Sequence, residues 1–173
     1  IKILSVGRFT VKKDYLSSIK TIALLKNKYK NIEYTIIGWG ELENKVRNWI
    51  TDNNINDITE IVINPKNLND YYIDSDIYLQ TSIYEGCPNT VLEAMSFSLP
   101  TVLTDAGDNN ILINDSEYLS QPGDIKGLYS GLNKLISSYE LRIQNGSQNY
   151  KLVKQNYSIN SFKNRYSKLI EKL

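Results

Sequence analysis

The chain contains no histidine and only one cysteine, Cys87, among its 173 residues. Without histidine, neither a Ser-His-Asp triad nor a Cys-His pair can form, and a zinc site would lack its usual ligands. A single cysteine cannot form a disulfide within the chain, which fits a reducing compartment. Cys87 has no histidine to activate its thiol, so we interpret it as a small loop residue rather than as a nucleophile.

Excess charge and long apolar runs are also missing. Twenty Lys and Arg residues nearly balance nineteen Asp and Glu residues, for a net charge of +1. This balance provides no overall field for a nucleic-acid partner, so an anion site must be local. No apolar run approaches the ~20 residues that a membrane-spanning helix needs, and no signal peptide is visible. The chain begins with what reads as a core strand, so we expect it to start within a longer protein.

Short apolar runs alternate with longer amphipathic segments along the whole chain. We predict strands at residues 1–6, 34–37, 61–63, 77–79, 100–103 and 118–119. We predict helices at 14–28, from 41 onward, and at 68–73, 89–97, 125–138, 139–153 and 158–173. Alternation of this kind predicts an α/β fold, a Rossmann-like doubly wound parallel sheet of about six strands with helices on both faces.

Ligands of such sheets bind where the strands end, near the point at which the strand order reverses. The first loop there, residues 7–13, begins with Gly7, which permits a sharp turn. Arg8 offers a planar fork for phosphate oxygens and Lys13 a compact charge. Together they could clamp a diphosphate without a metal ion, with solvated surface charges as the alternative.

Two more glycines, Gly38 and Gly40, follow the second predicted strand. They resemble a fragment of a dinucleotide-binding fingerprint, but Asn44 stands near the place of the third glycine, so this signal is weak. The pair indicates either an ordinary turn or a close approach of the backbone to a ligand.

Another predicted loop leads through Pro88 and Asn89 into a helix. We expect Asn89 to cap this helix, which would leave the amides of Thr90 and Val91 free. Free amides at a helix N-terminus bind anions, phosphate above all.

Two glutamates, Glu85 and Glu93, flank this helix start with seven residues between them. A carboxylate would repel phosphate, so we expect both to accept hydrogen bonds from sugar hydroxyls, such as the neighbouring pair of a ribose. Taken singly, each glutamate is better explained as an ordinary acid, Glu85 in an exposed loop and Glu93 in the first turn of the helix. Because Gly86 and Pro88 stand between them, we favour the binding role.

Taken in order, these residues resemble the C-terminal, donor-binding domain of the family 4 retaining glycosyltransferases, which have the GT-B fold. The motifs that carry the resemblance are Gly7-Arg8-Phe9 with Lys13, Gly38-Trp39-Gly40, Ser82-Ile83-Tyr84-Glu85-Gly86 with Glu93-Ala94, Pro100-Thr101-Val102, Asp105-Ala106-Gly107 and Pro122-Gly123-Asp124.

The resemblance implies a role for each matching position. The donor diphosphate would be bound by Arg8, Lys13, Gly86 and the amides of Thr90 and Val91. Glu93 would hold the ribose, and Glu85 would be the catalytic residue, close to the reacting carbon of the donor sugar. Further loop contacts would come from Gly7, Gly38, Gly40, Pro88, Asn89, Asp105 and Gly107. The family needs no cofactor and no bound metal, and its donors are nucleotide diphosphate sugars, here UDP- or GDP-sugars.

Three positions depart from the family pattern. Asp14 stands where a glycine usually follows the lysine, Asn64-Pro65 replaces a glycine near the base pocket, and Asp108 replaces a second glycine after Gly107. The departures at Asn64 and Asp108 leave open which base and which sugar the site accepts.

We therefore expect residues 1–173 to be the donor-binding half of a bacterial surface-polysaccharide glycosyltransferase that acts on a glycan or lipid-linked acceptor. The N-terminal acceptor domain would lie outside this sequence, so the chain alone should be nearly inactive. The predicted helix at 158–173 would either pack on that domain or join the core. A cytoplasmic enzyme is expected, with peripheral association at the inner membrane face left open.

The alternatives are a nucleotide-sugar epimerase on the same fold and a non-catalytic nucleotide-sugar-binding domain. A phosphorylase is less favoured, because no lysine stands in a setting suited to a pyridoxal cofactor.

Overall fold

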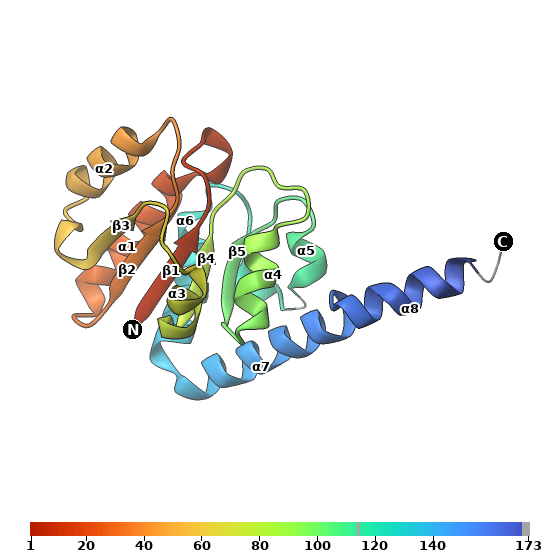
Figure 1. Ribbon diagram of the computed structural model, residues 1–173. Helices are drawn as coiled ribbons and strands as arrows, with labels where there is room; N and C mark the ends of the chain where they lie inside the picture. The colour runs from red at the N-terminus through yellow and green to blue at the C-terminus, as the bar shows by residue number, and fades with distance from the viewer. Residues whose placement is uncertain (114, 171–173) are drawn as a thin grey trace.

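In the computed structural model, residues 1–113 and 115–170 are described, and they form a six-stranded parallel sheet covered by helices (Figure 1). The strands are β1 Lys2–Val6, β2 Glu33–Ile37, β3 Thr59–Val62, β4 Ile77–Gln80, β5 Thr101–Thr104 and β6 Leu119–Ser120. Their order is β3-β2-β1-β4-β5-β6, and every neighbouring pair is parallel. The predicted doubly wound α/β fold is confirmed.

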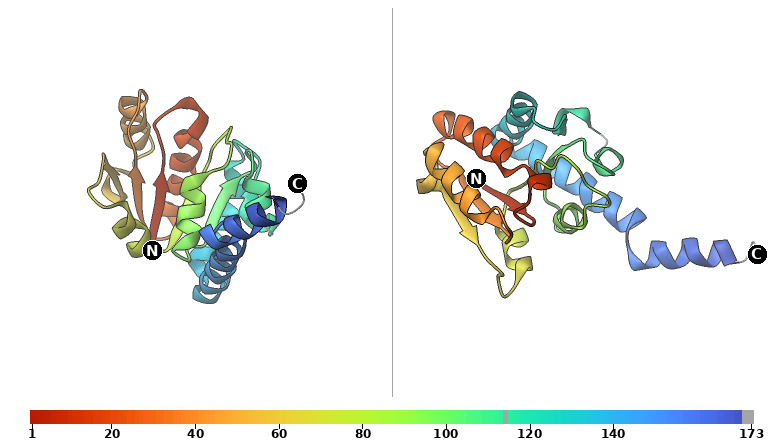
Figure 2. Two further views of the ribbon diagram at one scale, coloured as in Figure 1. Left: turned by 45° about the vertical axis from the view of Figure 1, so that its right-hand side comes forward. Right: turned by 90° about the horizontal axis from the view of Figure 1, so that it is seen from above.

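Helices lie on both faces of this sheet (Figure 2). They are α1 Tyr15–Lys28, α2 Glu43–Asp52, α3 Leu68–Asp74, α4 Asn89–Ser96, α5 Asn109–Leu112, α6 Ile125–Ser137, α7 Tyr139–Asn156 and α8 Ile159–Ile170. Three short 3-10 turns are η1 Val11–Lys13, η2 Asn56–Ile58 and η3 Ser116–Tyr118. Helices α1 and α6 pack together on one face, and α4 and α7 pack together on the other. None of the helices in the described part of the chain is long and apolar enough to cross a membrane.

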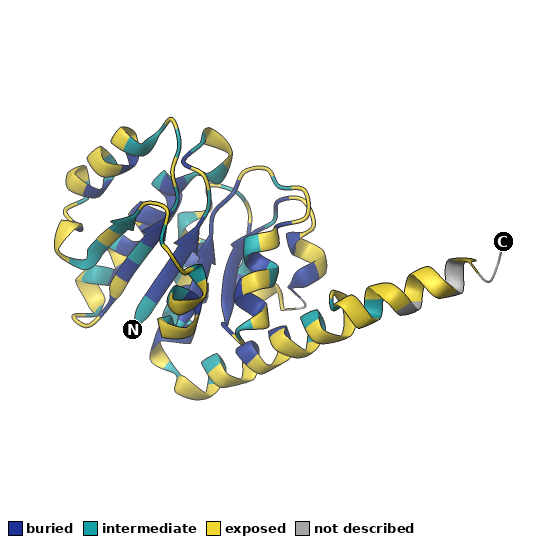
Figure 3. Cartoon of the chain, in the orientation of Figure 1, coloured by how far each residue is buried: buried dark blue, intermediate teal, exposed yellow. Residues whose placement is uncertain are grey.

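The core lies between the sheet and these two helical layers (Figure 3). All four residues of β4 and all four of β5 are buried, as expected for central strands of a parallel sheet that helices cover on both faces. Burying both faces of the central strands supplies the main hydrophobic stabilisation of the domain. It also fixes the strand ends from which the loops depart.

Several predicted boundaries were wrong. Helix α2 begins at Glu43 and not at Glu41, because residues 40–42 form a turn whose Leu42 amide donates to the Phe9 carbonyl at 3.0 Å. Strand β3 covers Thr59–Val62 rather than 61–63. Helix α7 continues three residues beyond the predicted end at Val153. The short helix α5, which follows β5, was not predicted.

The last helix leaves the body of the domain. Helix α8 extends from the end of α7 and projects away from the sheet, as Figure 1 and the right-hand view of Figure 2 show. Its apolar side chains Ile159, Phe162, Tyr166 and Ile170 are each more than half exposed. The structure therefore does not place this stripe in the core, which was one of the two expected alternatives. Residues 171–173 of the predicted helix lie outside the described residues.

Candidate functional site

The strand order reverses between β1 and β4, so the loops after these two strands face each other. The chain turns toward β2 after β1 and toward β5 after β4, which opens a crevice at the carboxyl ends of the strands. The two loops are also joined by their main chains. The Ile83 amide donates to the Lys12 carbonyl at 2.7 Å, and the Thr81 hydroxyl donates to the Asp14 carbonyl at 2.9 Å.

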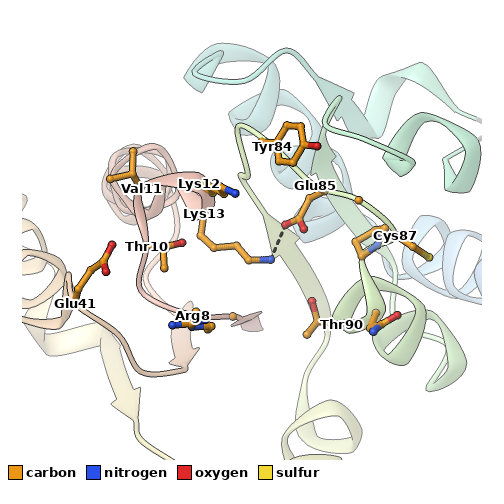
Figure 4. Close-up of a pocket in the computed structure, with 14 residues that line it drawn as sticks. Arg8, Thr10, Val11, Lys12, Lys13, Glu41, Tyr84, Glu85, Cys87 and Thr90 are labelled. Carbon is orange, nitrogen blue, oxygen red and sulfur yellow. Dashed lines mark hydrogen bonds and ion pairs between the residues drawn. The ribbon is translucent and has the colours of Figure 1, made fainter.

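A cleft of about 730 Å³ lies at this place (Figure 4). One wall is formed by Gly7, Arg8, Thr10, Val11, Lys12, Lys13 and Glu41, and the other by Tyr84, Glu85, Gly86, Cys87, Pro88, Asn89 and Thr90. Eight residues singled out from the sequence thus meet here, although they come from loops more than 70 positions apart. The predicted contacts Gly38, Gly40, Val91, Glu93, Asp105 and Gly107 do not line this cleft.

At the centre of the cleft, Lys13 faces Glu85 (Figure 4). The Lys13 ammonium lies 2.5 Å from Glu85 Oε1, and the Ser82 hydroxyl donates to the same oxygen at 2.5 Å. The two charged side chains are only 20% and 11% exposed, so their attraction is less screened than that of a surface pair. The pair joins the predicted diphosphate-binding cation to the predicted sugar-facing carboxylate.

Arg8 is held over an aromatic ring. Its guanidinium carbon lies 4.8 Å from the centre of the Trp39 ring, and Trp39 is half exposed. Arg8 and Trp39 also line a second hollow of about 370 Å³, which continues from the cleft toward Asn64 and Pro65. Stacking restricts the long Arg8 side chain and leaves its donors free to meet an anion.

The N-terminus of α4 differs from the prediction by one residue. The capping position is Pro88 and not Asn89, and no side chain in the described part of the chain caps this helix. The Val91 amide already donates to the Pro88 carbonyl at 3.0 Å, so the free amides are those of Asn89 and Thr90. The N-terminal amides therefore still face the cleft, shifted by one position, and the binding role of Val91 stays untested.

Glu93 projects from α4 outside the cleft lining and is held by a tyrosine. The Tyr72 hydroxyl donates to Glu93 Oε2 at 2.9 Å, while its ring is buried and stacks on Phe97. Burial is the main cause that raises the Tyr72 pKa well above its usual value, and the Glu93 charge raises it further. Tyr72 therefore stays protonated and keeps its donor on the carboxylate.

A second buried tyrosine ties the strand ends to α4. The Tyr78 hydroxyl lies 2.9 Å from Thr90 Oγ1 and 3.2 Å from the Val6 carbonyl. Burial is again the main cause of a raised pKa at Tyr78. The start of α4 is thereby fixed to the end of β1, which keeps the two walls of the cleft in register.

Close packing between loops explains two of the predicted glycines. A Cβ on Gly38 would lie 1.9 Å from the Gly7 carbonyl oxygen, so only glycine lets the second loop approach the first. Gly107 has φ +58°, and a Cβ there would lie 2.3 Å from the Glu85 carbonyl oxygen. Gly107 thus supports the Glu85 loop from behind, and we assign it no direct ligand contact.

Two departures from the family pattern conserve the backbone conformation. Asp14 and Asn64 have φ of 42° and 47°, in the left-handed region where Asn and Asp are tolerated better than most residues. Asp14 also caps α1, because its carboxylate accepts from the Ser17 amide at 3.4 Å, and it accepts from the Ser17 hydroxyl at 2.5 Å as well. Asp108, in contrast, has φ −80° at the cap of α5 and needs no glycine. The predicted loop contact Asp105 lies beside Gln121 at 3.4 Å.

Residues in and behind the cleft were missed as functional candidates in the sequence. Trp39 beneath Arg8, Tyr72 behind Glu93 and Ser82 beside Glu85 each position a predicted site residue. Glu41 adds a second carboxylate to the lining. Ser82 and Trp39 stand within motifs, since Ser82 lies three residues before Glu85 and Trp39 lies between Gly38 and Gly40, but neither was assigned a role.

The comparisons with known proteins agree with the fold. Residues 1–152 match the family described as glycosyl transferases group 1. The amylovoran biosynthesis glycosyltransferase AmsK of Erwinia amylovora is 34% identical over 145 residues, which cover 78% of this chain and 36% of AmsK. The chain spans about a third of the length of the curated relatives it matches.

Solved structures share the fold at lower sequence identity. HepE of Anabaena, in complex with UDP, has a TM-score of 0.89 at 16% identity, over 99% of this chain and 49% of HepE. A point mutant of Staphylococcus aureus TarM, in complex with UDP and sugar ligands, has a TM-score of 0.88 at 21% identity, over 97% of this chain and 35% of TarM. At these identities the likeness concerns the fold alone.

Proposed function

Because the chain belongs to the group 1 glycosyltransferases, a family with relatives in bacterial polysaccharide and capsule biosynthesis, we propose that its cleft binds a nucleotide diphosphate sugar. The domain would support retaining transfer of that sugar to a glycan or lipid-linked acceptor. The observation that carries this proposal is the meeting of Arg8 and Lys13 with Glu85 and the α4 N-terminus at the reversal of strand order.

The groups in and beside the cleft suit different parts of such a donor. Two cations and the free amides at the start of α4 can neutralise a diphosphate and stabilise the charge that develops when it leaves. The second hollow, beside Trp39 and Asn64, would take the base. Glu93, oriented by Tyr72, would accept the ribose hydroxyls, and Glu85 would face the sugar.

The acceptor side is proposed to come from a separate N-terminal domain. Helix α8 offers an apolar stripe that the rest of the described chain leaves exposed. A second domain packed on this stripe would bury it and cover the donor. The chain alone is therefore expected to bind a donor and to turn over very little. Its cytoplasmic location and its independence of metal ions stay predictions.

Arg8→Ala tests the donor site. Nucleoside diphosphates of uridine, guanosine and adenosine are compared by the rise in unfolding temperature that they cause. We expect one of them to stabilise the native chain, and the substitution to weaken its binding by about 1.5–3 kcal/mol, the usual value of a charge-assisted hydrogen bond.

Arg47→Ala provides the matched control. Arg47 lies on α2, where it forms an exposed ion pair with Glu43 that should contribute little. Binding should be unchanged in this variant. Equal losses in both variants would mean that the effect is general charge, and the absence of binding by all three nucleotides would contradict the proposed function.

A further inference from the structure

The carboxylate of Glu85 is occupied on one oxygen only. Lys13 and Ser82 both donate to Oε1. Among the side chains and amides that the structure describes, no donor lies within hydrogen-bonding distance of Oε2. The side chain points into the cleft (Figure 4), so Oε2 is available to a ligand there. Glu85 thus presents a negatively charged acceptor next to the cation that is proposed to hold the diphosphate.

The distance from Glu85 to a bound phosphate has an upper limit. A phosphate oxygen that accepts from Lys13 Nζ at about 2.8 Å would lie no farther than about 5.3 Å from Glu85 Oε1, because Lys13 and Glu85 are 2.5 Å apart. This distance is shorter than the Debye length of about 8 Å at physiological ionic strength. A negative charge added to that phosphate is therefore repelled by Glu85 with little screening.

Donor and product differ by one such charge. In the donor, the terminal phosphate is esterified to the sugar. Transfer breaks the bond between the sugar and the phosphate oxygen, and the bonding electrons stay on that oxygen. The released terminal phosphate then has a second ionisation with a pKa of about 6, so at neutral pH the product carries roughly one more negative charge than the donor.

We propose that Glu85 discriminates between the donor and the released nucleoside diphosphate, and that its charge promotes product release. This inference rests on the proposed function. In the donor, a sugar hydroxyl donates to Oε2 and the carboxylate stabilises the complex. In the product that hydroxyl is gone, the terminal phosphate carries the added charge, and the same carboxylate repels it. Glu85 therefore strengthens the binding of one ligand and weakens the binding of the other.

Glu85→Gln tests this inference, because the amide keeps the shape of the side chain and removes its charge. Binding is measured by calorimetry for three forms of the nucleotide that stabilises the native chain. These forms are the diphosphate, its terminal methyl ester and a hexose ester. The methyl ester has the charge of the donor but no sugar, so it separates charge from sugar contacts.

In the Glu85→Gln variant, the ratio of diphosphate affinity to methyl ester affinity should be about tenfold higher than in the native chain, equivalent to about 1.4 kcal/mol. The hexose ester should lose its advantage over the methyl ester. Glu41→Gln is the matched control, since Glu41 also lines the cleft but has no contact with Lys13 among the described residues. The ratio of diphosphate to methyl ester affinity should be unchanged in that variant.

Three outcomes have separate meanings. If Glu85→Gln changes the affinity of all three forms equally, the substitution has only released Lys13, and the discrimination is overturned. If Glu41→Gln changes the ratio as much, the effect belongs to the total charge of the cleft, and the role of Glu85 is again overturned. If the native chain binds none of the forms, the proposed function fails before this inference is reached. Thermal unfolding without ligand verifies that each variant is folded.

Discussion

Tyr72 is a buried residue whose one polar atom serves a carboxylate on a neighbouring helix. Tyr72→Phe removes that hydroxyl and keeps the ring that stacks on Phe97. We expect ribonucleotide binding to weaken by about 1 kcal/mol, the usual net value of one hydrogen bond, because Glu93 is no longer held in one orientation. The preference for a ribonucleotide over its deoxyribose analogue should fall as well, and calorimetry with the two nucleotides measures both changes.

Tyr71→Phe is the control for this prediction. Tyr71 is the neighbour of Tyr72 in α3, and none of the described residues hydrogen-bonds to its hydroxyl. Ribose discrimination should survive in this variant. If Tyr72→Phe lowers stability but leaves discrimination intact, the hydroxyl is merely structural.

Single residues that follow a strand could be found from the sequence, whereas their partners could not. Arg8 and Glu85 stand at fixed distances after apolar runs, so their place at the sheet edge follows from the fold class. Trp39 and Tyr72 acquire their roles through contacts across 31 and 21 positions of the chain. Stacking and hydrogen bonds of this kind depend on tertiary packing, which leaves no local pattern.

At the scale of elements, the turn into α1 depends on one residue. Asp14 adopts the left-handed conformation and caps the helix through Ser17. Asp14→Ala removes the cap and places a less tolerant residue at φ 42°. We expect the free energy of unfolding to fall by about 1–2 kcal/mol, measured by urea denaturation.

The variants Asp14→Asn and Asp14→Gly show how much of the lost stability comes from the helix cap and how much from the left-handed conformation. Asparagine keeps both the cap and the tolerance of positive φ, so it should retain most of the stability. Glycine relieves the strain and loses the side-chain cap, and caps made by glycine are weaker by only a few tenths of a kcal/mol. If asparagine were as destabilising as alanine, neither cap nor conformation would explain the position.

Element type was easier to predict than element boundaries. The periodicity of 125–138 and 139–153 predicted α6 and α7, since long amphipathic patterns average over many residues. The start of α2 was wrong by two residues because Leu42 binds the first loop rather than the helix. The cap of α4 was wrong by one residue, because local preference favours asparagine at a cap whereas the capping position is Pro88, with φ −82° and ψ 88°.

At the scale of the molecule, the two terminal helices contribute unequally to the domain. Helix α8 lies apart from the sheet (Figure 3), whereas α7 supplies two buried amides to the start of β5. Asn149 donates to the Leu99 carbonyl at 2.8 Å, and Asn145 accepts from the Thr101 amide at 3.2 Å. Removal of residues 158–173 should therefore lower the melting temperature by less than about 4 °C, the shift expected for 1 kcal/mol in a domain of this size.

Removal of residues 138–173 is the contrasting truncation. It deletes α7 together with the two buried asparagines, and it exposes α4 and β5 on one face of the sheet. This shorter chain should be strongly destabilised or unfolded, as circular dichroism during heating would reveal. Comparable losses in both truncations would mean that α8 stabilises the domain directly, against the exposure of its apolar stripe.

The hydrogen bond between the Ile83 amide and the Lys12 carbonyl has a consequence for the exchange of parts between relatives. This bond joins the loop after β1, which carries Lys13, to the loop after β4, which carries Glu85, although about 70 positions separate them. The conformation of each loop therefore depends on the other. In a chimera that receives only the loop after β4 from a relative, the main chain of that loop would have to pack on residues 11–13 of this chain, to which it is not matched. Sugar preference should therefore transfer between such enzymes only when both loops are transplanted together, and recombination during evolution faces the same restriction.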